Sequence, residues 1–203
     1  MKLYYTPGAC SLAVHVALRE AGAAFQLVRV DLAAQELEGG GDFAVANPRG
    51  YVPVLELEDG TRCTEAAALL QHIADTHPSA GLLAPAGTRE RLHAVQWLTF
   101  IATELHPRFG WLWRKDTPEA TRKACLHLLS LRLAELDNVL GQREYLAGAA
   151  LSVADAYCFA VASWIPMVGM SLGDFPSLAA YLGRIAARPA VRAALVAEGL
   201  SAQ

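Results

Sequence analysis

One cysteine stands where a strand-forming segment gives way to a helical one. Residues 3–5 favour a strand, Pro7-Gly8 breaks the chain, and from Ser11 the apolar residues recur at helical spacing. Cys10 is therefore predicted at or just before the first turn of a helix. There, unpaired backbone N–H groups and the positive end of the helix dipole favour an anion. A thiolate, either that of Cys10 or one brought by a ligand, is stabilised at such a position.

The helix end alone is too weak to ionise this thiol. The dipole contributes typically ~0.3 to 1 kcal/mol, and one pKa unit corresponds to about 1.4 kcal/mol. A thiol pKa of ~8.5 therefore falls by roughly one unit, and a further donor or cation is needed for a thiolate at neutral pH. The competing interpretation is that Cys10 is a small buried hydrophobe, which is the common fate of a free cysteine. Its position alone leaves both interpretations open.

A second polar group lies on a predicted helix that begins near residue 88. Thr99, Thr103 and His106 follow at i, i+4 and i+7, so their polar atoms are expected to project together. Pro107 is expected to kink or break this helix just after His106. An imidazole can donate a hydrogen bond to a thiolate or relay its proton, but a single helical histidine is more often structural or solvated.

The composition excludes several classes of protein. Of the 203 residues, 54% are hydrophobic and 18% are charged, which indicates a folded globular chain. A net charge of −3 without a Lys/Arg cluster offers no attraction for nucleic acid or an anionic membrane. The four cysteines are far apart, which argues against a metal site and against a disulfide scaffold. No apolar leader follows Lys2, so we expect a cytoplasmic protein. The uncharged residues 156–173 are interrupted by Pro166 and Gly169, which favours a buried core helix over a membrane span.

Residues 1–80 predict an α/β domain. A strand, a helix and a second strand at residues 25–32 indicate a right-handed parallel βαβ unit. A loop at residues 33–41, with a short helical turn at 35–37, leads to a strand at residues 51–57. A hairpin then returns at residues 62–64, and a helix opens directly afterwards.

Residues 81–87 have the composition of a linker, and residues 88–203 predict only helices. Within this second domain, residues 152–155 (S-V-A-D) fit a capping box at the start of an apolar helix.

Four short motifs resemble those of the cytosolic glutathione transferases. They are residues 7–11 (P-G-A-C-S), 47–53 (N-P-R-G-Y-V-P), 64–66 (T-E-A) and 152–155. The first of these, together with residues 104–106 (E-L-H), resembles the bacterial beta class. The resemblance spans the whole chain. It implies a thioredoxin-like N-terminal domain of βαβαββα order, an all-helical C-terminal domain, a homodimer, and glutathione bound along the first domain.

The resemblance also implies a set of site residues. Cys10 and His106 are implied as the catalytic pair. Pro53 is implied to be cis, which would turn the backbone of Val52 toward the cysteinyl part of glutathione. Glu65 would pair with the ligand ammonium, while a helix N-terminus offers N–H groups to its carboxylate. The glutathione contacts implied in full are Cys10, Gln35, Val52, Pro53, Glu65, Ala66, Thr99, Thr103, Glu104 and His106, with no metal.

The chain departs from the family pattern at several of these positions. Many relatives have serine at Ala66, asparagine at Thr99 and lysine at Gln35, and Pro107 also replaces a frequent lysine. A lost charge-assisted bond costs ~1.5 to 3 kcal/mol when it is buried and less when it is exposed. Glutathione is therefore expected either to bind more weakly or to be held by other groups.

The sequence thus predicts an enzyme that directs the glutathione thiolate onto a small hydrophobic electrophile in a cleft between the domains. Trp111, Trp113 and Trp164 are candidate walls of that cleft. Cys10 would either donate to the thiolate or form a mixed disulfide with glutathione, which would support thiol exchange. Tyr5 and Ser11 are rivals for the catalytic role, because other classes use a hydroxyl near this turn. The alternatives are a glutathione-dependent isomerase or dehalogenase and a non-catalytic binding protein of the same fold.

Overall fold

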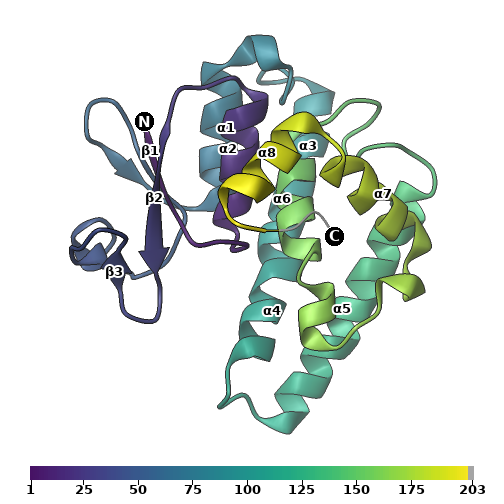
Figure 1. Cartoon of the computed structure of the whole chain (residues 1–203). Coiled ribbons are helices and arrows are strands. Elements are labelled where there is room, and N and C mark those ends of the chain that lie inside the picture. The colour runs from purple at the N-terminus through teal and green to yellow at the C-terminus, as the bar shows by residue number, and fades with distance from the viewer. Residues whose placement is uncertain (201–203) are drawn as a thin grey trace. The chain divides into compact units, whose positions relative to one another are not determined.

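The computed structural model describes residues 1–200, which form two units (Figure 1). Unit one comprises Met1–Leu83 together with the chain from Ala186 onward, and unit two comprises Ala84–Ile185. The fold is a thioredoxin-like domain with a mixed sheet followed by a helical domain, as the sequence predicted.

The frame of unit one is a five-stranded sheet of order β3-β2-β1-β4-β5. The central strand β1 (Lys2–Tyr5) pairs in parallel with β2 (Gln26–Asp31) and antiparallel with β4 (Val54–Glu56). The edges are formed by the two-residue strands β3 (Glu36–Leu37) and β5 (Arg62–Cys63), both antiparallel to their neighbours. The parallel pair confirms the predicted βαβ unit.

Helix α1 (Ser11–Glu20) connects the two parallel strands and contacts both α2 (Ala66–Thr76) and α8 (Pro189–Ala197). In Figure 1 these two helices lie beside α1. Every residue of α1 from Ser11 to Leu18 is consequently buried. A short 3-10 helix, Pro78–Ala80, follows α2.

Two local predictions in unit one were wrong. The expected helical turn at residues 35–37 is instead β3, because Gln35 has a φ of 58° and the Glu38 amide continues the pairing by donating to the Arg29 carbonyl. The second helix of the βαβαββα order is a 3-10 helix, Phe43–Val45, whose first turn is capped by the Asp42 carboxylate. The predicted strand at residues 51–57 is shortened to β4, since Pro53 has no N–H to donate to a ladder.

Unit two contains only helices among its regular elements. They are α3 (Arg89–Phe100), a π-helical turn (Ile101–Leu105), α4 (His106–Trp113), α5 (Glu119–Leu140), α6 (Val153–Ala162), two 3-10 helices (Ile165–Val168 and Leu172–Asp174) and α7 (Pro176–Ala186). The predicted capping box of Ser152 and Asp155 is present at the start of α6.

The helix break near Pro107 was predicted one step too late. It occurs before His106, where the π-helical turn inserts a wider turn between α3 and α4. Pro107 then lies in the first turn of α4, directly after the π-helical turn.

The predicted helical domain ran to residue 203, but the chain from Ala186 onward clusters with unit one. Helix α8 contacts α1, and Arg188, the residue before α8, forms an ion pair with Glu20 at the end of α1. Within residues 1–200, no helix is long and apolar enough to cross a membrane.

Candidate active site

Cys10 lies directly before α1, at its N-cap position, as predicted. The side chain is 8% exposed, and its Sγ donates a hydrogen bond to the Val52 carbonyl at 3.3 Å. The cysteine and the loop that precedes β4 are thereby brought into contact across 42 positions of sequence.

The protonation state of Cys10 is set by burial. Burial raises the pKa of its thiol to about 12, and hydrogen bonds from the backbone around Cys10 and Ser11 oppose this rise only in part. The helix end lowers a thiol pKa by roughly one unit, so desolvation outweighs it here. Cys10 is therefore a neutral hydrogen-bond donor at pH 7, which is the weaker of the two activities that its position allowed.

The two rival hydroxyl side chains are both buried. Ser11 is fully buried, and its Oγ both accepts from the Thr6 amide and donates to the Thr6 carbonyl, each at 3.3 Å. Tyr5 is 6% exposed, and burial together with the nearby Glu198 raises the pKa of its phenol.

The loop before β4 carries the predicted Val52-Pro53 element. The Val52–Pro53 peptide bond is cis, as the resemblance implied. Asn47 stabilises the loop internally, because its amide donates to the Tyr51 carbonyl at 2.7 Å and its Oδ1 accepts from the Arg49 amide at 3.1 Å. Val52 is 5% exposed.

Glu65 is the N-cap residue of α2 and adopts a positive φ of 72°, a conformation that costs free energy for a residue other than glycine. Its carboxylate accepts from the Tyr51 hydroxyl at 2.7 Å and lies 3.7 Å from Arg49 Nη1. Ala66 and Ala67 begin the helix, so their N–H groups have no partner within it. A carboxylate and a helix N-terminus are thus next to each other, which suits a ligand that carries both an ammonium and a carboxylate.

The side-chain amide of Gln35 is already hydrogen-bonded within unit one. Its Nε2 donates to the Leu32 carbonyl at 2.7 Å and to the Gly50 carbonyl at 3.1 Å, which ties two loops together. The contact requires glycine at position 50, because a Cβ there would lie 2.6 Å from Gln35 Oε1 and the φ is +68°. Gln35 is therefore a loop-bridging residue in this structure.

His106 begins α4 in unit two and lies in an aromatic cluster. Its Nδ1 is 2.8 Å from the Tyr157 hydroxyl, and its ring centroid is 5.1 Å from that of Trp164. Trp113 contacts the Trp164 ring at 4.8 Å. Trp111 does not join the cluster, since it is 45% exposed and lies under the Arg114 guanidinium. Two of the three candidate wall residues are therefore grouped around His106.

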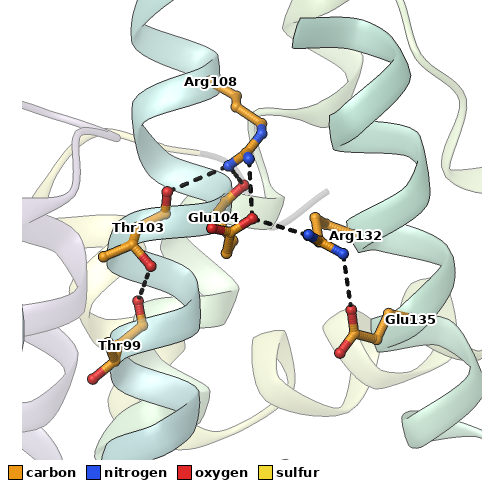
Figure 2. A network of polar contacts seen from close by, with 6 residues as sticks. All are labelled: Thr99, Thr103, Glu104, Arg108, Arg132 and Glu135. Carbon is orange, nitrogen blue, oxygen red and sulfur yellow. Dashed lines mark hydrogen bonds and ion pairs between the residues drawn. The ribbon is translucent and has the colours of Figure 1, made fainter. Parts of the chain in front are cut away.

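Thr99, Thr103 and Glu104 also lie in unit two, on α3 and the π-helical turn (Figure 2). Thr103 Oγ1 donates to the Thr99 carbonyl at 2.9 Å, so these two residues do share a face. The Glu104 carboxylate accepts from Arg108 Nη2 and from Arg132 Nε, each at 2.9 Å. The Arg132 hydrogen bond is the largest influence that lowers the pKa of Glu104. Glu104 thus ties the helix it belongs to onto α5.

Sequence reasoning missed the partners that hold the candidate residues. Tyr51 and Arg49 were read only as parts of a motif, although both reach Glu65. Tyr157 lies in the uncharged run predicted as a buried core helix, and its hydroxyl is hydrogen-bonded to His106. A phenol inside an apolar run is the signal that could have found it, because a buried tyrosine usually needs a hydrogen-bond partner. In residues 1–200 no cluster of His, Cys, Asp or Glu is arranged to hold a metal.

Comparison with known proteins agrees with this arrangement. Residues 8–76 match the family model for the glutathione S-transferase N-terminal domain, and residues 91–189 match that for the C-terminal domain. The glutathione S-transferase GstA of Escherichia coli O157:H7 is 44% identical over 200 residues, which are 98% of this chain and all of that protein. The chain therefore belongs to the glutathione S-transferase family.

Two solved structures define its place within the family. A sphingomonad glutathione S-transferase complexed with glutathione has a TM-score of 0.94 at 45% identity and covers 99% of this chain and 100% of its own. The bacterial beta class glutathione S-transferase of Sphingomonas chungbukensis has the same score, identity and coverage. The chain is accordingly a glutathione S-transferase of the bacterial beta class, with transferase activity by homology.

Proposed function

We propose that this enzyme conjugates the glutathione thiolate to small hydrophobic electrophiles, with glutathione bound along unit one. The observation that carries the proposal is the arrangement of Cys10 at the start of α1 in hydrogen-bond contact with Val52. The glutathione seen with the sphingomonad relative supports the same ligand here.

In this proposal the two ends of glutathione are recognised by different chemistry. The γ-glutamyl carboxylate accepts from the N–H groups at the start of α2, beginning with Ala66, and the ammonium pairs with Glu65. The backbone of Val52 pairs with the cysteinyl residue. Thr99, Thr103 and Glu104 remain candidate contacts in unit two. Gln35 contributes by holding its loops in place, because both donor hydrogens of its amide are in use.

The reactive sulfur is that of glutathione. Its thiol loses a proton to solvent or to a base, and the thiolate is stabilised by the N–H groups at the start of α1 and by the Cys10 S–H, which turns from the Val52 carbonyl toward it. The thiolate then forms a carbon–sulfur bond with the electrophile, which either expels its leaving group as an anion or accepts a proton. His106, whose ring Tyr157 orients, is the proposed second catalytic group.

Conjugation is favoured over thiol exchange through Cys10. A mixed disulfide requires the Cys10 thiolate, and a pKa of about 12 leaves very little of it at neutral pH. In the aromatic cluster around His106, Trp113 is 43% exposed and is the proposed apolar contact for the second substrate, while the buried Trp164 packs behind it.

We infer a homodimer as the working form. Apolar side chains are exposed on α3 and α5 of unit two, including Leu92 at 64% and Leu131 at 50%. We infer that these exposed leucines belong to a surface that another copy covers.

The proposal is tested by retention on immobilised glutathione and by turnover of a chlorodinitrobenzene-type electrophile. We expect retention that free glutathione reverses, and conjugate formation that depends on glutathione concentration. Retention without turnover would instead favour a non-catalytic binding protein, and a lack of retention and turnover together would refute the proposal.

A further inference from the structure

The backbone next to His106 contains a carbonyl group that lacks its usual helical donor. In an α-helix the Thr103 carbonyl would accept from the amide four residues later, but that residue is Pro107, which has no N–H. The preceding π-helical turn is closed differently, because the His106 amide donates to the Ile101 carbonyl five residues earlier. The backbone around His106 therefore lacks part of the regular α-helical hydrogen bonding.

The guanidinium of Arg108 supplies a donor to this turn (Figure 2). Its Nη1 donates to the Thr103 carbonyl at 3.3 Å and also to the Glu104 carbonyl. Its Nη2 donates to the Glu104 carboxylate at 2.9 Å. One side chain of α4 thus reaches back past His106 and binds the π-helical turn at two carbonyl groups and one carboxylate.

The placement of Arg108 has a cost that these contacts must offset. The side chain is 16% exposed, and within residues 1–200 its buried Nε–H has no hydrogen-bond partner. A buried donor without an acceptor destabilises the fold. The contacts of Nη1 and Nη2 hold the guanidinium there nevertheless, and the Glu104 carboxylate is itself fixed by Arg132 Nε of α5 at 2.9 Å. The π-helical turn is thereby anchored to a second helix.

We propose that Arg108 is a positioning residue for the transferase reaction, which replaces the amide hydrogen missing at Pro107 and so fixes the backbone that carries His106. The proposal rests on the function proposed above, in which His106 is the second catalytic group. The Tyr157 hydroxyl orients the imidazole ring at 2.8 Å, but it does not hold the backbone of His106. Reaction rates are sensitive to such placement, since a displacement of about 1 Å can cost roughly 100-fold.

The variant Arg108→Met tests this role, because it keeps much of the apolar stem and removes every donor. The matched control is Arg132→Met. It removes an arginine that bonds to the same Glu104 carboxylate but makes no hydrogen bond to the backbone of the π-helical turn.

We expect Arg108→Met to lower kcat about tenfold at saturating glutathione, and Arg132→Met to keep the wild-type kcat. Both variants should lower Tm. If Arg108→Met keeps the wild-type kcat while its Tm falls, Arg108 is merely structural and the proposal is wrong. An equal fall of kcat in both variants would assign the effect to the Glu104 carboxylate and would also refute the proposal. Should Arg108→Met fail to fold, Arg108→Lys keeps the charge but loses the forked donors, and the same kcat comparison applies.

The substitution Pro107→Ala tests the missing hydrogen directly, because it restores an N–H that can donate to the Thr103 carbonyl. The ratio of kcat before and after Arg108→Met is measured in the wild type and in the Pro107→Ala background. We expect this ratio to fall from about tenfold to less than about threefold, since the restored amide takes over one of the lost hydrogen bonds. A ratio that is the same in both backgrounds would overturn the proposal.

A further readout does not depend on glutathione. The rings of Tyr157 and Trp164 lie 5.9 and 5.1 Å from that of His106, so the NMR chemical shift of the His106 Cε1–H is sensitive to their relative placement. The signal is assigned with His106→Gln. We expect it to move by more than its line width in Arg108→Met and to stay in place in Arg132→Met. An unchanged shift in both would contradict the role of Arg108. Absence of turnover by the wild type would contradict only the proposed function, because the shift would still be measurable.

Discussion

At the scale of single residues, burial decides what Cys10 can do. Its position in the sequence favoured a stabilised thiolate, but Cys10 is only 8% exposed and burial raises the pKa of its thiol to about 12. Desolvation opposes the charged form more strongly than a helix end favours it. In the proposed reaction, the sulfur that the start of α1 stabilises is consequently the one that glutathione brings.

We expect Cys10→Ala to lower the conjugation rate about five- to tenfold without abolishing it. A neutral thiol contributes one weak hydrogen bond to the thiolate, which is worth about 1 kcal/mol. Conjugation rates at saturating glutathione measure this effect. Cys10→Ser, which keeps a donor, should stay near the wild-type rate. A fall of more than about 100-fold in the alanine variant would show that Cys10 itself ionises.

In the proposed complex, Glu65 contributes more to glutathione affinity than to rate. Its carboxylate is 64% exposed, so the lost attraction for the ligand ammonium is discounted for solvent screening to roughly 1 to 1.5 kcal/mol. We therefore expect Glu65→Gln to raise KM for glutathione roughly tenfold while kcat changes less. Steady-state kinetics with varied glutathione provides the measurement, and Glu58→Gln, at an exposed acid of the hairpin, is the control. Equal KM values in both variants would remove Glu65 from the ligand contacts.

At the scale of elements, the start of α6 depends on one carboxylate. Asp155 is fully buried and accepts from the Ser152 amide and hydroxyl, the Leu146 amide and the Tyr181 hydroxyl, at 2.7 to 2.9 Å. The capping box is thus one half of a larger network that also holds the preceding loop and α7.

We expect Ser152→Ala to lower the free energy of unfolding by about 1 kcal/mol and Asp155→Ala by about 3 kcal/mol. The larger cost arises because the Leu146 amide and the Tyr181 hydroxyl lose their acceptor inside the core. Urea denaturation measures both values. Ser163→Ala, at the exposed end of the same helix, should change stability by less than about 0.5 kcal/mol. Equal losses for the two capping variants would argue against the wider network.

Local chemistry decided which elements could be predicted from sequence. The capping box of Ser152 and Asp155 and the helix that opens after Glu65 were predictable because their signals lie within four residues. The π-helical turn before His106 and the two-residue strand β3 could not be predicted. Tertiary contacts impose both of them, and no local sequence signal marks either. The site residues followed from motifs, whereas their partners, such as Tyr157, become apparent only once helices are packed.

At the scale of the whole molecule, the acid limit of stability is set in part by Glu56. Hydrogen bonds from Lys2 and then Arg62 lower the pKa of its carboxyl from 4.5 to about 2, and Tyr4 also donates to it. A carboxylate whose pKa is lower in the folded state stabilises the fold above the pKa of the unfolded chain. That contribution is lost as the pH falls through the folded-state value.

We therefore expect Tm to decline as the pH falls from about 4.5 to about 2. In Glu56→Gln this part of the decline should be smaller, with a lower Tm at neutral pH, because the pairing with Lys2 and Arg62 is already gone. Thermal unfolding followed by circular dichroism across this range makes the comparison. If Tm of the wild type and of Glu56→Gln declined in parallel over this pH range, Glu56 would have the same pKa in the folded and unfolded states, and the prediction would be wrong.

The hydrogen bond from the Gly8 amide to the Glu198 carboxylate bears on the order in which the protein is completed. Unit one is built from segments on either side of unit two in the sequence. Ribosomal synthesis therefore delivers Glu198 only after all of the helical unit has been made. The turn before Cys10 is synthesised before the helical unit and Glu198 after it, so a nascent chain that has not yet reached residue 198 lacks the carboxylate that accepts a hydrogen bond from the Gly8 amide.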